Sequence, residues 1–310
     1  MTPRGRDERP GRRYRVALLG NGIGASLSPA LHVAEARHLG LDYTYRTVDL
    51  LGRARVDLGA ELRLLEDAGY AATNVTHPYK QAVLEHVTDL SPTARRLGSA
   101  NLVLLDGGRR TAHNTDQPGF RGALAGFLGD DGARGTVLQV GAGGAGRATV
   151  AALLDLGVGT VVVHDADPAA VATLLDRFTD AVGPQGSGPP RLLGSGGRLE
   201  HWLPRADGVV HVTPVGMAEH PGVAFDVGRL GPAAWVAEVV YRPLETELLR
   251  RARARGLATL DGGGMAVGQA VESLRLITGL EPDAARMHAH FRRLVAGPDT
   301  SAAPDPLEEA

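Results

Sequence analysis

Residues 136–146 read Thr-Val-Leu-Gln-Val-Gly-Ala-Gly-Gly-Ala-Gly, and a run of small and apolar residues follows them as far as Asp155. The β-branched, apolar segment Thr136–Val140 predicts a buried strand. A helix is expected from Arg147 to about Asp155. A strand, a Gly-x-Gly-x-x-Gly loop and a helix in this order indicate a dinucleotide-binding βαβ unit rather than an ordinary glycine-rich turn.

Each glycine of this loop has a different expected task. Gly141 permits the tight turn, Gly143 lets the backbone approach a pyrophosphate, and Gly146 lets helix and strand pack closely. The amides of Gly144 and Ala145 would then lie at a helix N-terminus, where the helix dipole favours an anion.

The acidic residue after the next strand bears on the choice of cofactor. Asp165 lies about 20 residues beyond the third glycine, the spacing expected of an acid that holds the adenosine ribose. Its carboxylate would accept from the 2′-hydroxyl and repel a 2′-phosphate, and Ala166 leaves no arginine for that phosphate. Asp167 before Pro168 is typical of a helix N-cap, which leaves Asp165 free. The sequence therefore favours NAD over NADP.

The rest of the chain alternates short β-type runs with helical ones, which is typical of a mostly parallel α/β sheet. Expected strands are 15–19, 43–48, 72–75, 102–105, 110–113, 136–140, 159–164, 208–212 and 235–239. Expected helices are 30–39, 59–68, one opened by Pro78, 147–155, 168–178, 246–255 and C-terminal helices over 265–294. Residues 106–108 predict a hairpin turn, and 183–197 a surface loop.

The expected fold class is α/β, with an N-terminal α/β substrate domain and a Rossmann-type, doubly wound dinucleotide-binding domain. The expected organisation is a disordered tail over 1–13, a substrate-binding and catalytic domain over 14–118, a dinucleotide-binding domain over 119–264, C-terminal helices that pack back on the substrate domain over 265–296, and a disordered tail over 297–310.

Composition excludes several classes of protein. The 33 basic and 35 acidic residues leave a net charge of -2, which argues against nucleic acid or an anionic membrane as the main partner. The absence of cysteine excludes disulfides, thiolate catalysis and Cys-ligated metals. No apolar run reaches the ~20 residues that span a bilayer, and the polar N-terminus lacks the core of a secretory signal. A cytoplasmic protein is expected.

Of the 33 basic residues only one, Lys80, is a lysine. The chain also has few asparagines, and Asn74, Asn101 and Asn114 lie at or next to expected strand ends, where α/β proteins bind ligands. Arginine keeps its proton in proteins, whereas lysine becomes a base when its pKa is lowered. In the first turn of a helix opened by Pro78, the dipole would disfavour the Lys80 cation, while a nearby Asp116 would favour it.

Taken together, the motifs resemble those of the shikimate/quinate dehydrogenase family, over about residues 15–294. They are Gly20-Asn-Gly-Ile-Gly-Ala-Ser26-Leu-Ser28-Pro29 with His32, Asn74-Val-Thr76-His-Pro-Tyr-Lys80, Gly98-Ser-Ala-Asn101, Asn114-Thr-Asp116, Gly141–Gly146, Thr213-Pro-Val-Gly-Met217, Val240-Tyr241-Arg-Pro, Thr246-Glu-Leu-Leu249, and Gly262-Gly-Gly-Met265 through Gln269.

The resemblance implies reversible hydride transfer between a ring hydroxyl of quinate or shikimate and a nicotinamide cofactor, without a metal. Lys80 and Asp116 are implied as the catalytic pair. The implied ligands of the substrate, a hydroxylated cyclohexane or cyclohexene carboxylate, are Ser26, Ser28, Thr76, Asn101, Tyr241 and Gln269. The implied cofactor contacts are Gly141, Ala142, Gly143, Gly144, Ala145, Asp165, Val239 beside the nicotinamide, and Gly262.

This chain also departs from the biosynthetic members of that family. Those enzymes usually have His where Ala25 stands, Thr where Leu102 stands, Asn where His211 stands, and Asn-Arg-Thr in place of Asp165-Ala-Asp. The acid without arginine resembles the NAD-dependent quinate/shikimate branch of actinobacteria, and Leu102 would remove a hydroxyl near the substrate. Alternatives are an NADP-dependent biosynthetic shikimate dehydrogenase, an aminoshikimate or aminoquinate dehydrogenase, or a non-catalytic nicotinamide-binding regulator. A homodimer is left open.

Overall fold

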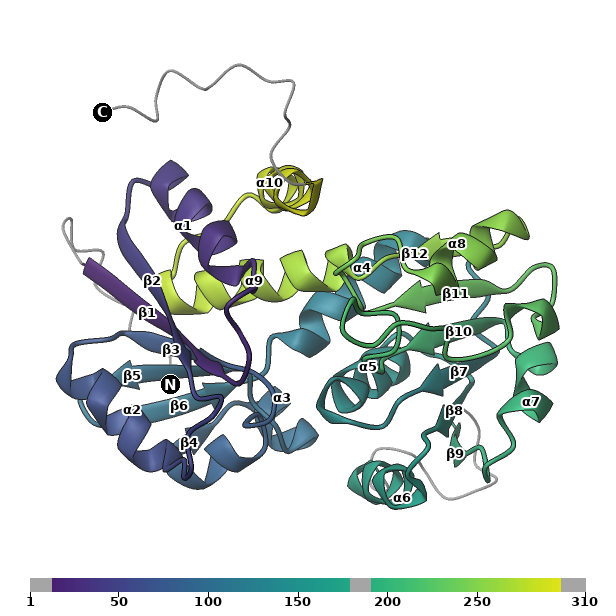
Figure 1. Ribbon diagram of the computed structural model, residues 1–310, viewed down its shortest axis with the longest axis horizontal. Coiled ribbons are helices and arrows are strands. Elements are labelled where there is room, and N and C mark those ends of the chain that lie inside the picture. The colour runs from purple at the N-terminus through teal and green to yellow at the C-terminus, as the bar shows by residue number, and fades with distance from the viewer. Residues whose placement is uncertain (1–12, 179–190, 297–310) are drawn as a thin grey trace.

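The computed structural model describes residues 13–178 and 191–296, which form two α/β halves joined by crossing helices (Figure 1). Each half is built on one six-stranded sheet. The two-sheet α/β architecture expected from the alternation of strands and helices is confirmed. Both predicted tails lie outside the described residues except Arg13, which begins the first strand.

The N-terminal sheet is mixed. Its strands have the order β2-β1-β3-β5-β6-β4, and β5 runs antiparallel to both β3 and β6. Gly107 and Gly108 turn the predicted β5–β6 hairpin with φ of 57° and 88°, values that only glycine adopts readily. The strands are β1 Arg13–Gly20, β2 Asp42–Asp49, β3 Ala72–Val75, β4 Asp89–Leu90, β5 Leu102–Asp106 and β6 Arg109–His113.

The helices of this half are α1 Ser28–His38, α2 Leu58–Asp67, α3 Pro92–Leu97 and the 3₁₀ segment η1 Ala82–His86. The α-helix expected to open at Pro78 is wrong, because residues 77–81 form turns that lead into η1. The Lys80 carbonyl accepts from the Ala100 amide at 2.7 Å instead of from an amide of its own helix. Lys80 therefore has no α-helix dipole behind it.

The second sheet is parallel throughout, in the order β12-β11-β10-β7-β8-β9. The chain starts in the middle at β7, builds outward to β9, and returns to the other side of β7 with β10. This reversal is the topological switch point of a doubly wound dinucleotide fold. The strands are β7 Thr136–Val140, β8 Thr160–His164, β9 Arg191–Gly194, β10 Gly208–His211, β11 Trp235–Glu238 and β12 Ala258–Leu260.

The second half also carries the helices α5 Gly144–Asp155, α6 Pro168–Arg177, α7 Leu199–Trp202, η3 Leu203–Arg205, η4 Val227–Arg229 and α8 Glu247–Ala254. Helix α5 starts at Gly144, earlier than the expected Arg147, because the glycine loop itself supplies its first turn. A surface loop was expected over 183–197, but residues 191–194 form strand β9, so this prediction is wrong there. Residues 183–190 lie outside the described residues.

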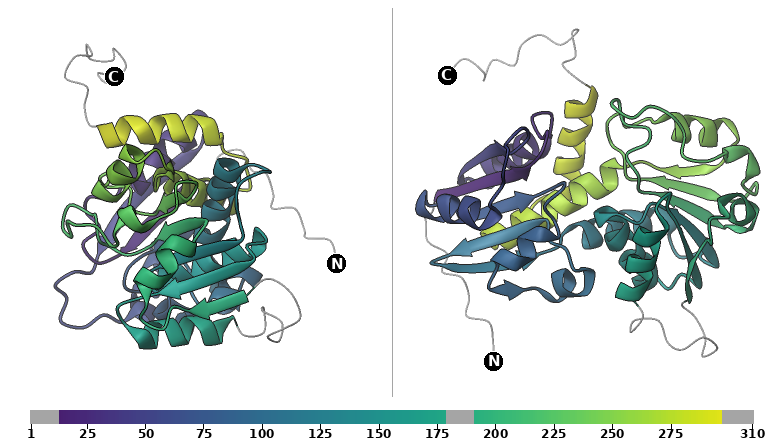
Figure 2. Two further views of the ribbon diagram at one scale, coloured as in Figure 1. Left: turned by 90° about the vertical axis from the view of Figure 1, so that its right-hand side faces the viewer. Right: turned by 60° about the horizontal axis from the view of Figure 1, so that its bottom comes forward.

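Two helices join the halves. Helix α4 (Asp116–Leu128) leaves the N-terminal sheet, and α9 (Gly263–Thr278) returns to it, as Figure 2 shows. Leu274 and Ile277 of α9 pack in one hydrophobic cluster with Val16 of β1. The predicted domain limits at 118/119 and 264/265 remain predictions, and both fall inside these connecting helices.

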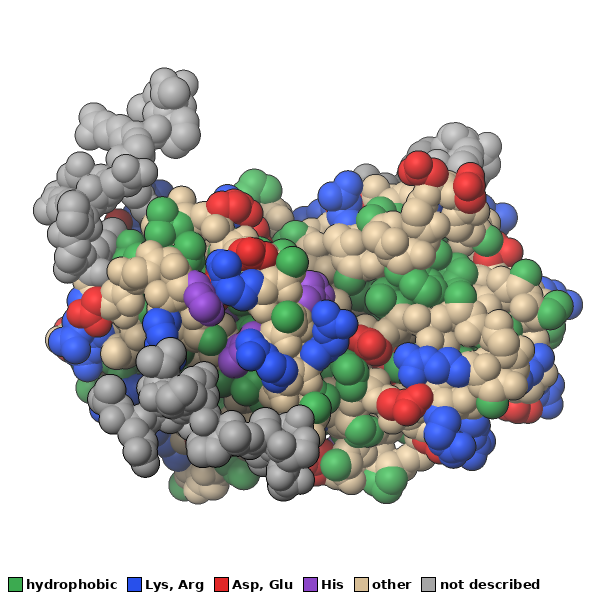
Figure 3. Space-filling view, turned by 90° about the horizontal axis from the view of Figure 1, so that it is seen from above, with side chains coloured by type: hydrophobic (Ala, Val, Ile, Leu, Met, Phe, Trp, Pro, Cys, Tyr) green, Lys and Arg blue, Asp and Glu red, His purple; other side chains and the backbone are tan. Residues whose placement is uncertain are grey.

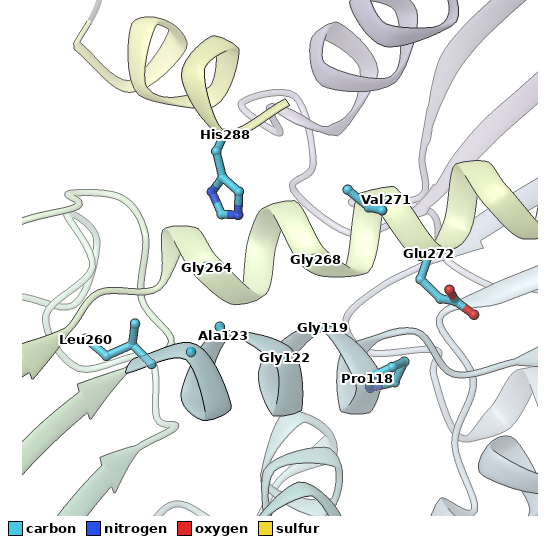
Figure 4. A pocket seen from close by; sticks show the side chains of 11 residues that line it. Pro118, Gly119, Gly122, Ala123, Leu260, Gly264, Gly268, Val271, Glu272 and His288 are labelled. Carbon is cyan, nitrogen blue, oxygen red and sulfur yellow. The ribbon is translucent and has the colours of Figure 1, made fainter. Parts of the chain in front are cut away.

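Helices α4 and α9 cross at two glycines. A Cβ on Gly119 would lie 2.6 Å from the Gln269 amide nitrogen, and one on Gly268 would lie 2.8 Å from the Gly119 Cα. Beside the crossing, glycines of both helices border a hollow of about 420 Å³, with His288 above it (Figure 4). Only residues without a Cβ permit this approach of the two backbones.

The last helix, α10 (Ala284–Ala296), is tied to α1 by an ion pair. Arg286 contacts both carboxylate oxygens of Glu35, at 2.8 and 2.7 Å, and Glu35 is only 1% exposed. Figure 3 shows this side of the molecule, where basic side chains (blue) and histidines (purple) gather. Among the described residues, no helix is long and apolar enough to cross a membrane.

The glycine crossing gives a paired stability prediction. Gly119→Ala should lower the free energy of unfolding by about 1–3 kcal/mol, because the new Cβ overlaps the α9 backbone. Gly122→Ala on the same helix meets no atom within 4 Å, so the higher helix propensity of alanine should raise stability by about 0.5–1 kcal/mol. Urea unfolding measures both changes. Opposite signs are expected, and a stabilised Gly119→Ala protein would contradict the close crossing.

Candidate active site

The only lysine lies against a buried carboxylate. Lys80 Nζ donates to Asp116 Oδ2 at 2.7 Å, and the two side chains are 21% and 7% exposed. Asp116 is the first residue of α4, and Lys80 lies in the turn after β3. The fold therefore brings the two predicted catalytic residues together, with the lysine more open to solvent than its partner.

Asn101 holds the other oxygen of this carboxylate. Its Nδ2 donates to Asp116 Oδ1 at 2.9 Å, while its Oδ1 accepts from the Thr115 amide at 2.7 Å. Asn114 Oδ1 accepts from the Asp116 amide at 3.1 Å. Two of the scarce asparagines thus orient Asp116, so that Oδ2 is directed at Lys80.

A second layer of buried hydrogen bonds reaches α9. Ser273 Oγ lies 3.1 Å from Thr115 Oγ1 and accepts from Asn74 Nδ2 at 3.2 Å. Asn74 Nδ2 also donates to the Asn101 carbonyl at 3.1 Å. Ser273 belongs to none of the motifs recognised in the sequence. Its spacing of four residues from Gln269, which places the two on one helix face, was the available signal.

The loop after β1 is held by a carboxylate that the sequence analysis also missed. Asp49, at the end of β2, accepts from the amides of Gly22, Ile23 and Leu51 at 2.9, 3.1 and 3.0 Å. These backbone donors lower the pKa of Asp49. Asp49 thus anchors the loop that carries Ser26 through the backbone of that loop.

Two further contacts fix this loop relative to the rest of the site. Tyr79 immediately precedes Lys80 in the chain, and its hydroxyl donates to Asn21 Oδ1 at 2.8 Å. The Arg242 guanidinium, from the other half of the molecule, donates to the Ala25 carbonyl. The first contact holds the 20–29 loop against the turn that carries Lys80, and the second holds it against the other half of the molecule.

The remaining predicted substrate ligands lie on the elements around this pair. Ser26 Oγ accepts from the Ser28 amide at 3.3 Å, Thr76 follows β3, and Gln269 Nε2 donates to the Ala266 carbonyl at 3.0 Å. Burial raises the pKa of Tyr241. That these side chains bind one substrate stays a prediction.

Two other predicted features need correction or restriction. Leu102 is fully buried in the hydrophobic cluster with Val16 and Leu274, because side chains alternate along β5 and Asn101 takes the site-facing position. Leu102 therefore does not line the site. His32 is also fully buried, with Nδ1 3.0 Å from the Tyr43 hydroxyl, and burial lowers its pKa to about 3.

The glycine loop fits a dinucleotide pyrophosphate. A Cβ on Gly141, where φ is 119°, would lie 2.9 Å from the Val212 carbonyl carbon, and one on Gly146 would lie 2.7 Å from the Gly141 oxygen. Nothing lies within 4 Å of a Cβ built on Gly143 or Gly144. The outer glycines thus serve packing, while the middle ones leave space above the α5 N-terminus for an anion.

Asp165 has more contacts than expected. Its Oδ2 accepts from the Ala142 amide at 2.7 Å and its Oδ1 from the Asp167 amide at 2.9 Å. The expectation that Asp165 is free is wrong, although each oxygen retains a lone pair for a ribose hydroxyl. Asp167 caps α6 through the Ala169 amide, as predicted.

The two other predicted cofactor residues lie at the opposite side of the switch point. Val239 follows β11, and a Cβ on Gly262 would lie 2.5 Å from the carbonyl oxygens of Val239 and Val240. The absence of a side chain at Gly262 lets these two segments pack together. Their contact with a nicotinamide stays a prediction.

Comparison with known proteins agrees with this arrangement. A family model described as "Shikimate dehydrogenase substrate binding domain" matches residues 18–103. A Streptomyces avermitilis protein named shikimate dehydrogenase (NADP(+)) is 50% identical over 287 residues, covering 91% of this chain and 96% of that protein. A Corynebacterium efficiens protein named quinate/shikimate dehydrogenase (NAD(+)) is 45% identical, covering 90% and 98%.

Among solved structures, quinate dehydrogenase from Corynebacterium glutamicum in complex with NAD has a TM-score of 0.83 and 42% identity, covering 90% of this chain and 99% of that one. Sequence identity of this extent over nearly the whole chain, with the same two-sheet architecture, shows common descent. The chain belongs to the shikimate dehydrogenase family of oxidoreductases.

Proposed function

We propose that the protein is an NAD-dependent dehydrogenase that reversibly oxidises a ring hydroxyl of quinate or shikimate to the 3-dehydro ketone. The observation that carries this proposal is the Lys80–Asp116 pair, 2.7 Å apart, in a chain whose other half has a dinucleotide fold. An alcohol loses a hydride and a proton when it is oxidised, and these two halves supply an acceptor for each.

Lys80 takes the proton. In the oxidative direction, uncharged Lys80 Nζ accepts the hydroxyl proton while the carbonyl forms, and the resulting ammonium is stabilised by the adjacent Asp116 carboxylate. In the reductive direction, the same ammonium donates the proton to the ketone oxygen. Asn101 keeps the carboxylate oriented throughout, because it occupies the oxygen that Lys80 does not use.

The cofactor supplies the hydride acceptor. Gly143 and Gly144 leave its pyrophosphate room at the α5 N-terminus, and Asp165 is oriented by two backbone amides so that its second lone pairs are open to ribose hydroxyls. With alanine and not arginine at position 166, a 2′-phosphate would face the negative charge of Asp165. These features support NAD as the preferred cofactor.

The substrate is proposed to lie between the 20–29 loop and α9. Hydroxyl and amide side chains there suit a polyhydroxylated ring acid, because each supplies donors and acceptors to ring hydroxyls and the carboxylate. The proposed ligands are Ser26, Ser28, Thr76, Asn101, Tyr241 and Gln269.

One observation favours a second candidate. The Streptomyces avermitilis relative, at 50% identity, is named an NADP(+)-dependent shikimate dehydrogenase, whereas the quinate/shikimate relatives named for NAD(+) are 44–45% identical. An NADP-linked shikimate dehydrogenase is therefore the alternative. Steady-state rates with quinate and shikimate, each with NAD and NADP, test both candidates. If neither acid yields NADH, the NAD-dependent quinate or shikimate dehydrogenase is excluded. A preference for NADP would favour the NADP-linked shikimate dehydrogenase.

The role of Lys80 is tested by two substitutions. Lys80→Ala should lower kcat by about 10²–10⁴-fold, the usual contribution of a general acid/base. Lys80→Arg should be nearly as damaging, because it keeps a cation next to Asp116 but does not release a proton. Fluorescence titration with NADH should show unchanged binding by both variants. Wild-type turnover by Lys80→Arg would contradict proton transfer at this residue.

The charge of Asp165 sets the expected cofactor preference. Asp165→Asn removes the charge and keeps one of the two oxygens that accept from backbone amides. The ratio of kcat/KM for NADP to that for NAD should rise at least about tenfold, since like charges ~4 Å apart near a surface repel by a few kcal/mol. Asp167→Asn is the matched control, because asparagine caps a helix as well as aspartate does. An equal rise of this kcat/KM ratio in both variants would contradict a specific role of Asp165 in cofactor choice.

A further inference from the structure

A buried acid–imidazole pair lies at the carboxyl ends of two neighbouring strands in the second half. His211 ends β10 and Glu238 ends β11, and the two residues are partners in the parallel register. His211 Nδ1 lies 2.9 and 3.0 Å from the two Glu238 oxygens, and the side chains are 1% and 0% exposed. Burial of both groups is costly unless each finds hydrogen-bond partners.

The contacts of Glu238 assign the imidazole proton. Glu238 Oε1 accepts from the Val239 and Val240 amides at 3.0 and 3.1 Å, and Oε2 lies 3.4 Å from the donating Thr246 hydroxyl. Every group that faces this carboxylate is thus a donor, so His211 Nδ1 also donates. In the neutral imidazole with hydrogen on Nδ1, Nε2 is an acceptor.

The hydrogen bonds that run from Glu238 through His211, called the relay below, end at the hydroxyl of the partly buried Thr213. His211 Nε2 lies 2.5 Å from Thr213 Oγ1. In the neutral Nδ1–H tautomer this nitrogen accepts, so the hydroxyl donates to the ring. Thr213 Oγ1 also accepts from the Val215 amide at 3.3 Å. The oxygen keeps one lone pair for a ligand. Thr213 is half-exposed, next to Val212, which donates its amide to Val140 and packs against Gly141 of the cofactor loop.

We propose that Glu238 and His211 are positioning residues that fix the Thr213 hydroxyl as a hydrogen-bond acceptor for the carboxamide NH₂ of the nicotinamide. In a doubly wound sheet, the strands beyond the switch point serve the second nucleotide, and β10 and β11 lie on that side of β7. The inference rests on the proposed function, because it assumes a nicotinamide dinucleotide. It assigns a task to two residues that the hydride-transfer chemistry leaves unused.

The hydroxyl is tested first. Thr213→Val keeps the shape and removes the oxygen, so the dissociation constant of NADH should rise about fivefold to tenfold, the scale of one hydrogen bond. KM for the acid substrate should change less than twofold, and Thr213→Ser should restore cofactor binding. Thr160→Val is the matched control, because Thr160 is equally half-exposed on the same sheet but lies at its opposite, amino edge. Unchanged NADH binding by Thr213→Val would overturn the proposal.

The relay itself is tested by reversing its polarity. Glu238→Gln has one acceptor oxygen, which the Val239 and Val240 amides occupy, so its NH₂ group would face His211. His211 then carries its hydrogen on Nε2 and donates to Thr213, and the hydroxyl lone pair is consumed. The expected result is the loss of NADH affinity seen in Thr213→Val, with little change in the midpoint of thermal unfolding.

Nitrogen-15 NMR reads the tautomer without any cofactor. The His211 signal, identified by its absence in His211→Asn, should shift from the Nδ1–H to the Nε2–H pattern in Glu238→Gln. A wild-type Nε2–H tautomer, or normal NADH affinity in Glu238→Gln, would overturn the relay. Failure of the wild type to oxidise quinate or shikimate would instead count against the proposed function, while NADH binding and the NMR pattern still test the relay.

Discussion

The contact of Gly119 with Gly268 governs how the two halves of the molecule share one site. Neither residue has a Cβ, so α4 and α9 approach until backbone touches backbone. Asp116 lies about one turn before Gly119, and Ser273 lies about one and a half turns beyond Gly268. The crossing therefore sets the position of the Asp116 carboxylate relative to the Ser273 hydroxyl, which contacts the neighbouring Thr115. Larger side chains at the crossing would separate these two groups before either met a ligand.

Features that depend on local sequence were predicted well. The strand Thr136–Val140, the β5–β6 hairpin and the Asp167 cap follow from β-branched runs, paired glycines and an Asp-Pro dipeptide, each of which acts over a few residues. The expected helix at Pro78 failed because its competitor is distant in sequence. The Lys80 carbonyl is taken by the Ala100 amide, and no pattern near Lys80 indicates that bond.

The same limit applies to the supporting residues of the site. Asp49 and Ser273 are ordinary in sequence, yet one anchors three backbone amides and the other links Asn74 to Thr115. Spacing predicted a role for Asp165 in cofactor binding, but it did not indicate the bond of Asp165 to the Ala142 amide. A motif indicates which residues meet a ligand, whereas the residues that orient them are selected by the three-dimensional path of the chain.

The two halves nevertheless solve one electrostatic problem in the same way. In each half, a buried carboxylate accepts hydrogen bonds from fixed donors, and its remaining lone pairs face one side chain that carries a proton. Asn101 orients the Asp116 carboxylate toward Lys80. Backbone amides orient the Glu238 carboxylate toward His211. Because the fold supplies those fixed donors, the carboxylates need not reorganise when a ligand arrives. Under the proposed function, lysine suits the first position because it can release its proton, and under the proposed hydrogen-bond relay, imidazole suits the second because its proton stays on Nδ1.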